Sequence, residues 1–235
     1  MITFNKVDKR FADVVVMEGF CEEFEENAVS CILGPSGCGK TTMLNLLGRI
    51  LTEDSGQITK PERVSYVFQD EALVPQKTAR KNLELVLKSV YREKAELRRV
   101  IDKFLKISDL VEAADLYPHE MSGGMRQRLA LIRAFAYPSD ILLMDEPFKT
   151  LDITLKNNII KSFLSLYEED RRTVLFVTHD VDEALMTGDY IYVYGSKPLR
   201  LQRKFSVEGK KGERKLYADS LTKIKNEVYM ETEKW

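Results

Sequence analysis

The chain has 235 residues, of which 44% are hydrophobic and 9% aromatic. Because this composition supplies enough apolar side chains for a packed core, it excludes a disordered or collagen-like chain. Lys and Arg total 36 against 37 for Asp and Glu, so the formal net charge is -1 and no global positive field draws the protein to nucleic acid or anionic lipid. The length exceeds one ordinary domain and falls short of two, which favours one compact unit with an inserted subdomain.

The cysteines and the hydropathy pattern favour a cytosolic location. An odd number of cysteines at irregular spacing, Cys21, Cys31 and Cys38, can neither pair completely nor form a metal-ligand pattern, which favours a reducing environment. The N-terminus lacks the apolar core of a signal peptide, and no stretch approaches the roughly 18 uninterrupted apolar residues of a spanning helix. We therefore expect a cytosolic protein that does not cross a membrane by itself.

The first part of the chain predicts β structure followed by a strand, a glycine loop and a helix. Short β-rich runs interrupted by charged and small residues predict an antiparallel meander over residues 1–24. Residues 28–33 are nearly all apolar and stop at Gly34, as in a parallel strand covered on both faces. A helix that ends before residue 53 is indicated by apolar residues at helical spacing: Met43, Leu46, Leu47, Ile50 and Leu51.

The middle of the chain changes from strands to helices. Residues 64–68 are typical of another strand, which ends at Gln69. Over residues 72–137 strand patterns vanish and charges alternate, and Pro138 stops the last helix of this stretch. One face of an amphipathic helix is marked by Leu97, Val100, Ile101, Phe104 and Leu105. We expect a helical insertion here.

The last part returns to alternating strands and helices. Buried-strand patterns over residues 141–144 and 174–178 flank a predicted helix at 153–167, which indicates right-handed crossovers and a mostly parallel sheet. A closing hairpin is expected over 190–203 and a charged helix from about residue 214. Functional groups collect at the carboxyl ends of parallel strands. Such ends are predicted at Gly34, Gln69, Asp145 and His179.

The glycine-rich turn matches the pattern of a phosphate-binding loop, and it lies between a predicted strand and a predicted helix as that motif requires. Glycines let consecutive backbone N–H groups point into one concavity, and the helix adds its positive end. Lys40 would reach the outer phosphates, and Thr41 would hold Mg²⁺. An ordinary glycine turn with a chance lysine is the alternative. The expected nucleotide-binding residues are Gly34, Pro35, Ser36, Gly37, Cys38, Gly39, Lys40, Thr41 and Thr42.

Two acidic residues follow the buried strand at 141–144. Asp145 suits Mg²⁺ coordination, directly or through water, and Glu146 suits a general base that polarises the attacking water. A solvated strand end or a helix cap would be the better interpretation if the pair stood alone. Beside a phosphate loop, metal binding and catalysis are favoured.

Only one of the two histidines occupies a strand end. His179 follows a buried strand, as the acidic pair does, so we expect it to face the γ-phosphate. His119 lies in a predicted turn, and a solvated loop residue is the preferred interpretation there.

A second anion site is predicted at the head of a helix. Ser122, Gly123 and Gly124 offer a hydroxyl, free backbone amides and a positive helix end. Simple N-capping would explain the serine but not both glycines. Two phosphate sites on different subdomains make sense if each nucleotide is held between two copies of the protein.

Taken together, these ordered motifs resemble those of the ATP-binding subunit of an ABC transporter, over residues 1 to about 205. The glycine loop resembles Walker A, and Ile141-Leu-Leu-Met-Asp-Glu146 resembles Walker B. Residues 121–128 resemble the signature, although Met121 stands where leucine is usual. The remaining matches are Gln69 for the Q-loop, Leu151 and Asp152 for the D-loop, His179 for the switch histidine and Phe11 for the aromatic residue that stacks on adenine.

The resemblance implies an α/β P-loop NTPase with a mostly parallel core sheet, an N-terminal antiparallel β subdomain and an inserted α-helical subdomain. The single ABC ATPase domain, 1–235, would comprise the core at 1–71 and 138–205, the helical signature subdomain at 72–137 and a C-terminal helical tail at 206–235. The implied catalytic residues are Glu146, His179 and Lys40. ATP would also contact Phe11, Gln69, Ser122, Gly123, Gly124 and Asp152, and Mg²⁺ would contact Thr41, Gln69 and Asp145.

Two expectations are less direct. A core aromatic of the β-meander is the alternative for Phe11. The D-loop departs from the family pattern at Lys149 and Thr150, which puts its usual contacts across a dimer in question.

The resemblance also implies partners and a location. A second copy would complete the ATP sites, and two transmembrane permease subunits would dock near residues 69–75 at the cytoplasmic face of the membrane. An external solute-binding protein is expected, nucleic acid is not, and the solute would be small, such as nitrate, a sulfonate or taurine. The alternatives are a nucleotide-gated ABC clamp in DNA repair or translation, which usually carries a coiled-coil insertion or two ATPase units, and a P-loop small-molecule kinase, which has no reason for the Ser122 segment.

Overall fold

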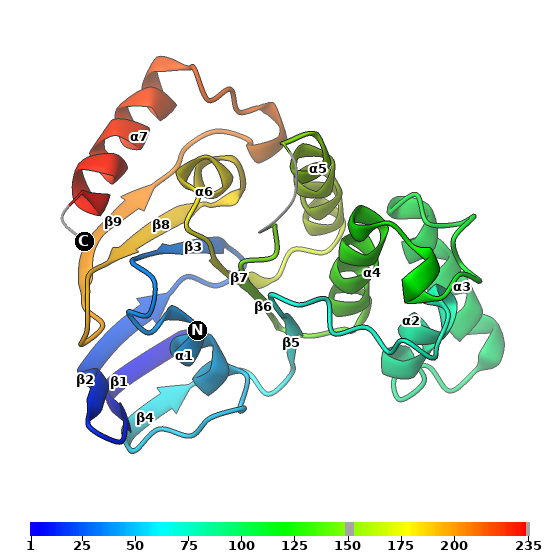
Figure 1. The fold of residues 1–235 in the computed structure, drawn as a ribbon, viewed down its shortest axis with the longest axis horizontal. Coiled ribbons are helices and arrows are strands. Elements are labelled where there is room, and N and C mark those ends of the chain that lie inside the picture. The colour runs from blue at the N-terminus through cyan, green and yellow to red at the C-terminus, as the bar shows by residue number, and fades with distance from the viewer. Residues whose placement is uncertain (149–152, 234–235) are drawn as a thin grey trace.

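A computed structural model of the chain describes residues 1–148 and 153–233. Within these ranges the strands form a three-stranded sheet in the order β2-β1-β4 and a six-stranded sheet in the order β5-β6-β7-β3-β8-β9. Helix α1 lies between the two sheets, and α5 and α6 lie on the opposite side of the larger sheet (Figure 1). The expected α/β class, with a mostly parallel sheet and an antiparallel N-terminal sheet, is confirmed.

The smaller sheet is antiparallel and contains a strand that the sequence did not predict. Strands β1 (Ile2–Phe11) and β2 (Val14–Phe24) form a hairpin, and β4 (Ser55–Thr59) pairs with β1. The turn-forming residues of β4 suggested only a loop. Gly56 has φ +86°, and a Cβ there would lie 2.3 Å from the carbonyl oxygen of Lys6. Glycine therefore serves the close approach of two backbones at an irregular point in the pairing.

The larger sheet has a fully buried centre. Every residue of β3 (Val29–Leu33), β6 (Ile141–Asp145) and β7 (Thr173–Val177) is buried, as their continuous apolar runs predicted. These strands pair in parallel with each other and with β5 (Val64–Val67) and β8 (Tyr190–Tyr194). The expected closing hairpin is present, since β9 (Leu201–Ser206) runs antiparallel to β8.

Alternation along these strands divides the core into two clusters. Ile32, Leu143 and Tyr192 point toward α1 (Lys40–Leu47) and the smaller sheet, whereas their chain neighbours point toward the helices on the other face. Helix α1 ends one turn earlier than predicted. Gly48 caps it, and Ile50 lies outside the helix with 53% of its surface exposed.

Helices occupy the chain between β5 and β6 and extend to one side of the molecule (Figure 1). They are α2 (Ala79–Leu87), α3 (Lys94–Ile107), the 3-10 helix η1 (Pro118–Glu120) and α4 (Gly123–Ala136). The predicted amphipathic face of α3 is real, because Ile101 and Leu105 are buried and continue the core cluster on that side of the sheet. None of the helices in the described part of the chain combines the length and apolar character that a membrane-spanning segment needs.

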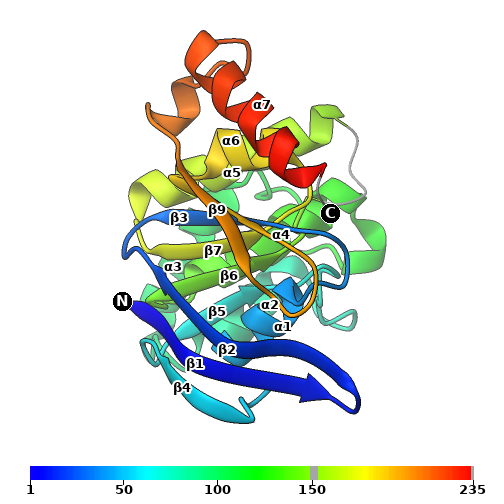
Figure 2. The same ribbon diagram turned by 90° about the vertical axis from the view of Figure 1, so that its left-hand side faces the viewer.

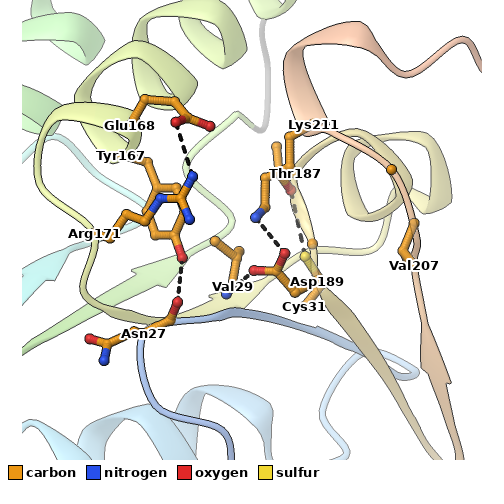
Figure 3. A network of polar contacts seen from close by, with 12 residues as sticks. Asn27, Val29, Cys31, Tyr167, Glu168, Arg171, Thr187, Asp189, Val207 and Lys211 are labelled. Carbon is orange, nitrogen blue, oxygen red and sulfur yellow. Dashed lines mark hydrogen bonds and ion pairs between the residues drawn. The ribbon is translucent and has the colours of Figure 1, made fainter.

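The C-terminal segment is fixed to the core by buried polar contacts. Helix α7 (Asp219–Thr232) packs on α6 (Val181–Thr187), beside β8 and β9 (Figure 2). Ahead of it, the Lys211 ammonium lies 2.5 Å from Asp189 Oδ1, and the other carboxylate oxygen accepts a 2.8 Å hydrogen bond from Val29 N (Figure 3). The tail is therefore tied directly to the start of β3, the strand that precedes the phosphate loop.

Candidate active site

The loop between β3 and α1 has the conformation that its glycines predicted. Gly37 and Gly39 have φ +76° and +122°, and a Cβ on Gly39 would lie 2.6 Å from Val16 Cγ1. Lys40 is buried, and its ammonium donates hydrogen bonds to Gly34 O at 2.7 Å and Pro35 O at 2.9 Å. The loop thus holds a positive charge at the N-terminus of a helix, which is an arrangement that binds phosphate.

A cavity of about 410 Å³ opens above this loop. Most of the predicted nucleotide-binding residues of the loop line it, whereas Gly34 and Cys38 lie buried at its base. The predicted residues on the cavity wall are Phe11, Ser36, Gly37, Gly39, Lys40, Thr41, Thr42 and Glu146. Val16 and Lys197 also line the cavity, and the sequence did not single them out.

Phe11 lies at the end of β1 and belongs to the cavity wall rather than the core. Its side chain is 44% exposed, so the alternative of a core aromatic does not describe its position. The Lys9 ammonium lies 5.5 Å from the ring centroid and is held there by Asp54 at 2.6 Å. An exposed aromatic face on the wall of a cavity is a suitable platform for a planar base.

The carboxyl ends of β6 and β7 bring the acidic pair and His179 together. Asp145 ends β6 and is buried beside Val177 of β7. Glu146 follows with φ +45°, and its backbone N–H donates to Val177 O at 2.9 Å. Its Oε2 lies 3.8 Å from Nδ1 of His179. A left-handed backbone at a non-glycine residue is costly, and such strain concentrates at functional sites.

The other predicted residues lie outside the cavity. Gln69 is exposed two residues beyond β5. Ser122 caps α4 by accepting a 3.3 Å hydrogen bond from Met125 N, and Gly124 is buried against Leu155. Met121, which replaces the usual leucine, is 4% exposed. The D-loop positions Lys149, Thr150, Leu151 and Asp152 lie outside the described residues.

The residues available for Mg²⁺ fit a hard cation. Thr41 stands exposed in the first turn of α1, and Asp145 ends β6, against which α1 packs. A hydroxyl and one carboxylate are oxygen donors of the kind that Mg²⁺ takes together with phosphate oxygens and water. In residues 1–148 and 153–233 no cluster of three or more His, Cys, Asp and Glu side chains could hold a metal by itself.

One ion-pair cluster beside the site was not predicted. Lys156, in the first turn of α5 (Ile153–Glu169), lies 2.8 Å from both Asp180 Oδ2 and Glu183 Oε1. Asp180 directly follows His179 and caps α6 by accepting hydrogen bonds from Asp182 N and Glu183 N. Burial raises the pKa of the Glu183 carboxyl, although Lys156 and Thr178 oppose the rise. The only sequence signal was Asp180 as a helix N-cap.

Comparison with known proteins agrees with this geometry. The family model for the ABC transporter matches residues 19–149. The nitrate import ATP-binding protein NrtD of Synechococcus elongatus is 36% identical over 195 residues, which cover 78% of this chain and 71% of NrtD. The formylaminopyrimidine import ATP-binding protein ThiZ of Halalkalibacterium halodurans is 34% identical over 202 residues, which cover 85% of this chain and 81% of ThiZ.

Among solved structures, the dimeric ATP-binding cassette MJ0796 bound to ADP and Pi superposes with a TM-score of 0.77. It is 29% identical in sequence, and the match covers 89% of this chain and 100% of that one. The chain therefore belongs to the ABC transporter family. It is the ATP-binding subunit of an ABC transporter, an ATPase that powers transport, and relatives of the chain are named for import.

Proposed function

We propose that this subunit powers the import of a small solute such as nitrate, a sulfonate or taurine. The observation that supports the ATPase part is that the buried Lys40 and the strained Glu146 line one cavity, and that His179 lies beside Glu146. The similarity to proteins named for nitrate import and formylaminopyrimidine import supports the direction of transport and the size of the solute.

In the proposed complex, the adenine stacks on Phe11 and the phosphates enter the glycine loop. Backbone N–H groups of the loop and the Lys40 ammonium bind the phosphate oxygens. Thr41, Asp145 and Gln69 are the residues that would hold Mg²⁺. The bound Mg²⁺ neutralises charge on the triphosphate.

The chain's own side chains then act on the terminal phosphate. Glu146 orients a water molecule and accepts its proton as the water oxygen bonds to the γ-phosphorus. The bond between the γ-phosphorus and its bridging oxygen breaks, so that ADP leaves and inorganic phosphate is formed. His179 and Lys40 stabilise the negative charge that develops on the phosphoryl oxygens. The 3.8 Å separation of Glu146 Oε2 and His179 Nδ1 supports these neighbouring roles.

Each site is completed by a second copy. We assign the phosphate-facing role in that copy to Ser122, Gly123 and Gly124 at the head of α4, together with Asp152. The support is that Ser122, Gly123 and Gly124 at the helix N-terminus do not line their own copy's cavity, and that the cassette MJ0796 is dimeric. Two permease subunits at the cytoplasmic face of the membrane, docked near residues 69–75, and an external solute-binding protein complete the proposed transporter.

The chemical assignment is tested with Glu146→Gln. We expect this variant to bind ATP, to remain as a closed dimer and to lose turnover by about 100-fold or more, because it lacks the proton acceptor. Glu62→Gln makes the same change at an exposed glutamate away from the cavity and should leave turnover unaltered. Turnover of Glu146→Gln close to that of the wild-type protein would remove Glu146 from the base role.

The solute assignment needs the whole transporter. The protein would be purified with its membrane subunits, and ATP turnover would be measured with nitrate, sulfonates or taurine and the matching binding protein. Stimulation by one of these solutes is the expected result. Stimulation only by an unrelated solute would refute this assignment and leave the ATPase assignment intact.

A further inference from the structure

We propose that Lys197 binds the nucleotide in its own copy, where it places a second positive charge beside the ribose and inner phosphates. This inference rests on the proposed nucleotide site and adds a residue from the β8–β9 turn, which carries none of the family motifs identified in the sequence. The structure puts Lys197 on the wall of the same cavity as Phe11, Gly39 and Lys40.

The turn that carries Lys197 is fixed against the nucleotide loop. Leu199 is 2% exposed, and its backbone N–H donates to Val16 O at 2.8 Å. Its Cβ lies 3.7 Å from where a Cβ on Gly39 would be, and Tyr194 O lies 3.2 Å from the equivalent point on Gly34. The turn is thus hydrogen-bonded to Val16 of the cavity wall at one end and lies beside Gly34 of the loop at the other. The position of Lys197 along the nucleotide follows from these anchors.

The Lys197 ammonium is available to a ligand. Its side chain is exposed, and within residues 1–148 and 153–233 it has no ion pair or hydrogen bond. The neighbouring lysines differ, because Lys40 is held by two loop carbonyls and Lys9 by Asp54. A lysine without a carboxylate partner on the wall of a phosphate site gains a charge-assisted hydrogen bond when an anion enters.

The anchors also indicate which part of the nucleotide Lys197 contacts. The outer-phosphate end of the cavity is marked by Glu146 and the Lys40 ammonium, and the base end by Phe11. The β8–β9 turn is hydrogen-bonded to Val16 and lies beside Gly39, both of which line the cavity, and we assign it the stretch between these two ends. Lys197 therefore contacts groups that ATP and ADP share. It contributes to binding and not to the chemical step.

The test compares Lys197→Gln with Arg200→Gln. Arg200 is exposed in the same turn but does not line the cavity, so the control removes the same charge. Affinities for MgADP and for a non-hydrolysable MgATP analogue would be measured by calorimetry at low and high salt. We expect Lys197→Gln to weaken both about 3- to 10-fold at low salt, with a smaller loss at high salt, because the exposed charge is screened. Arg200→Gln should bind as the wild-type protein does.

Two further readouts separate binding from folding and chemistry. Lys197→Arg should retain most of the affinity, and the kcat of Lys197→Gln at saturating ATP should equal that of the wild-type protein. Equal affinities in Lys197→Gln and Arg200→Gln would overturn the proposal, as would a loss confined to the ATP analogue or a fall in kcat with affinity intact. If the wild-type protein bound neither nucleotide, the proposed function itself would fail.

Discussion

The ion pairs of Lys156 give a quantitative test of how the segment that follows His179 is held. The Lys156 ammonium on α5 lies 2.8 Å from a carboxylate oxygen of Asp180 and 2.8 Å from one of Glu183. Both acidic residues follow His179 in the chain. The Glu183 side chain is only 5% exposed, and its other oxygen accepts a 2.5 Å hydrogen bond from Thr178 Oγ1. Lys156→Met keeps most of the apolar stem of the side chain and removes its charge.

The expected loss of stability is about 2 kcal/mol at pH 7. Removing one partner of a fully buried ion pair costs about 3–5 kcal/mol, because the other charge stays buried without compensation. Lys156 and Asp180 are 24% and 32% exposed, so water compensates part of that cost. The buried Glu183 accounts for most of what remains.

The difference in unfolding free energy between Lys156→Met and the wild-type protein should depend on pH. Burial already raises the pKa of Glu183 above its ordinary value of 4.5, and loss of Lys156 raises it further. A carboxyl whose pKa is raised in the folded state weakens folding at pH values above that pKa, and the penalty is relieved as the pH falls toward 4.5. The pKa of Asp180 is lowered in the wild-type protein, with Lys156 among the causes. The stability that this carboxylate contributes is therefore lost only as the pH falls below its ordinary pKa of 3.8. The difference in unfolding free energy between Lys156→Met and the wild-type protein should therefore be smaller at pH 4.5 than at pH 7.

Urea unfolding followed by circular dichroism at both pH values measures these differences. Lys156→Arg preserves the charge and should recover most of the stability. Lys161→Met removes an exposed lysine from the same helix and should change stability by less than about 0.5 kcal/mol. Lys156→Met as stable as wild type at pH 7, or a gap that is the same at both pH values, would refute the reasoning.

Two further predictions concern the site. Phe11→Ala should weaken ATP binding about 3- to 10-fold in calorimetry, because the ring is available for stacking on adenine. The unfolding temperature should change little, because the ring is 44% exposed. Unchanged affinity would remove Phe11 from the adenine site. Gly124→Ala should destabilise the fold by about 1–2 kcal/mol, because the added Cβ would lie 2.3 Å from Leu155 Cδ1. This overpacking outweighs the gain of about 1 kcal/mol in helix propensity that alanine brings. Adding Leu155→Ala should reduce that loss in thermal unfolding, and an equal loss without the Leu155 contact would contradict the steric explanation.

Features encoded by neighbouring residues could be predicted from the sequence. The buried strands are continuous apolar runs, and the phosphate loop is defined by glycines and a lysine within a few positions, so both could be located with their chemistry. The start of α4 could be predicted for the same reason, because Ser122 caps the helix that it precedes. Local signals failed at β4, where turn-forming residues pair with β1, and at the end of α1, where Gly48 ends the helix before the apolar spacing does.

Features that depend on packing between distant segments could not be predicted. Val16 reaches the cavity from the β1–β2 hairpin and Lys197 from the β8–β9 turn. The residues next to them in the sequence form no pattern that indicates a ligand. The partners of Lys156 lie 24 and 27 residues further along the chain, on the far side of a buried strand. An isolated lysine on a helix is usually solvated, so only the packing of α5 on α6 shows its role.

The first turn of α5 connects the two regions that we assign to opposite nucleotides. Leu155 fills the space beside Gly124 at the head of α4, and the next residue, Lys156, holds the segment that follows His179. Because Leu155 packs closely against Gly124, a shift of α4 toward α5 would displace the first turn of α5. That turn would carry the shift to Lys156, because its backbone is hydrogen-bonded. In the proposed dimer, this packing would link a nucleotide contact at the head of α4 to the segment that follows His179 in the same copy.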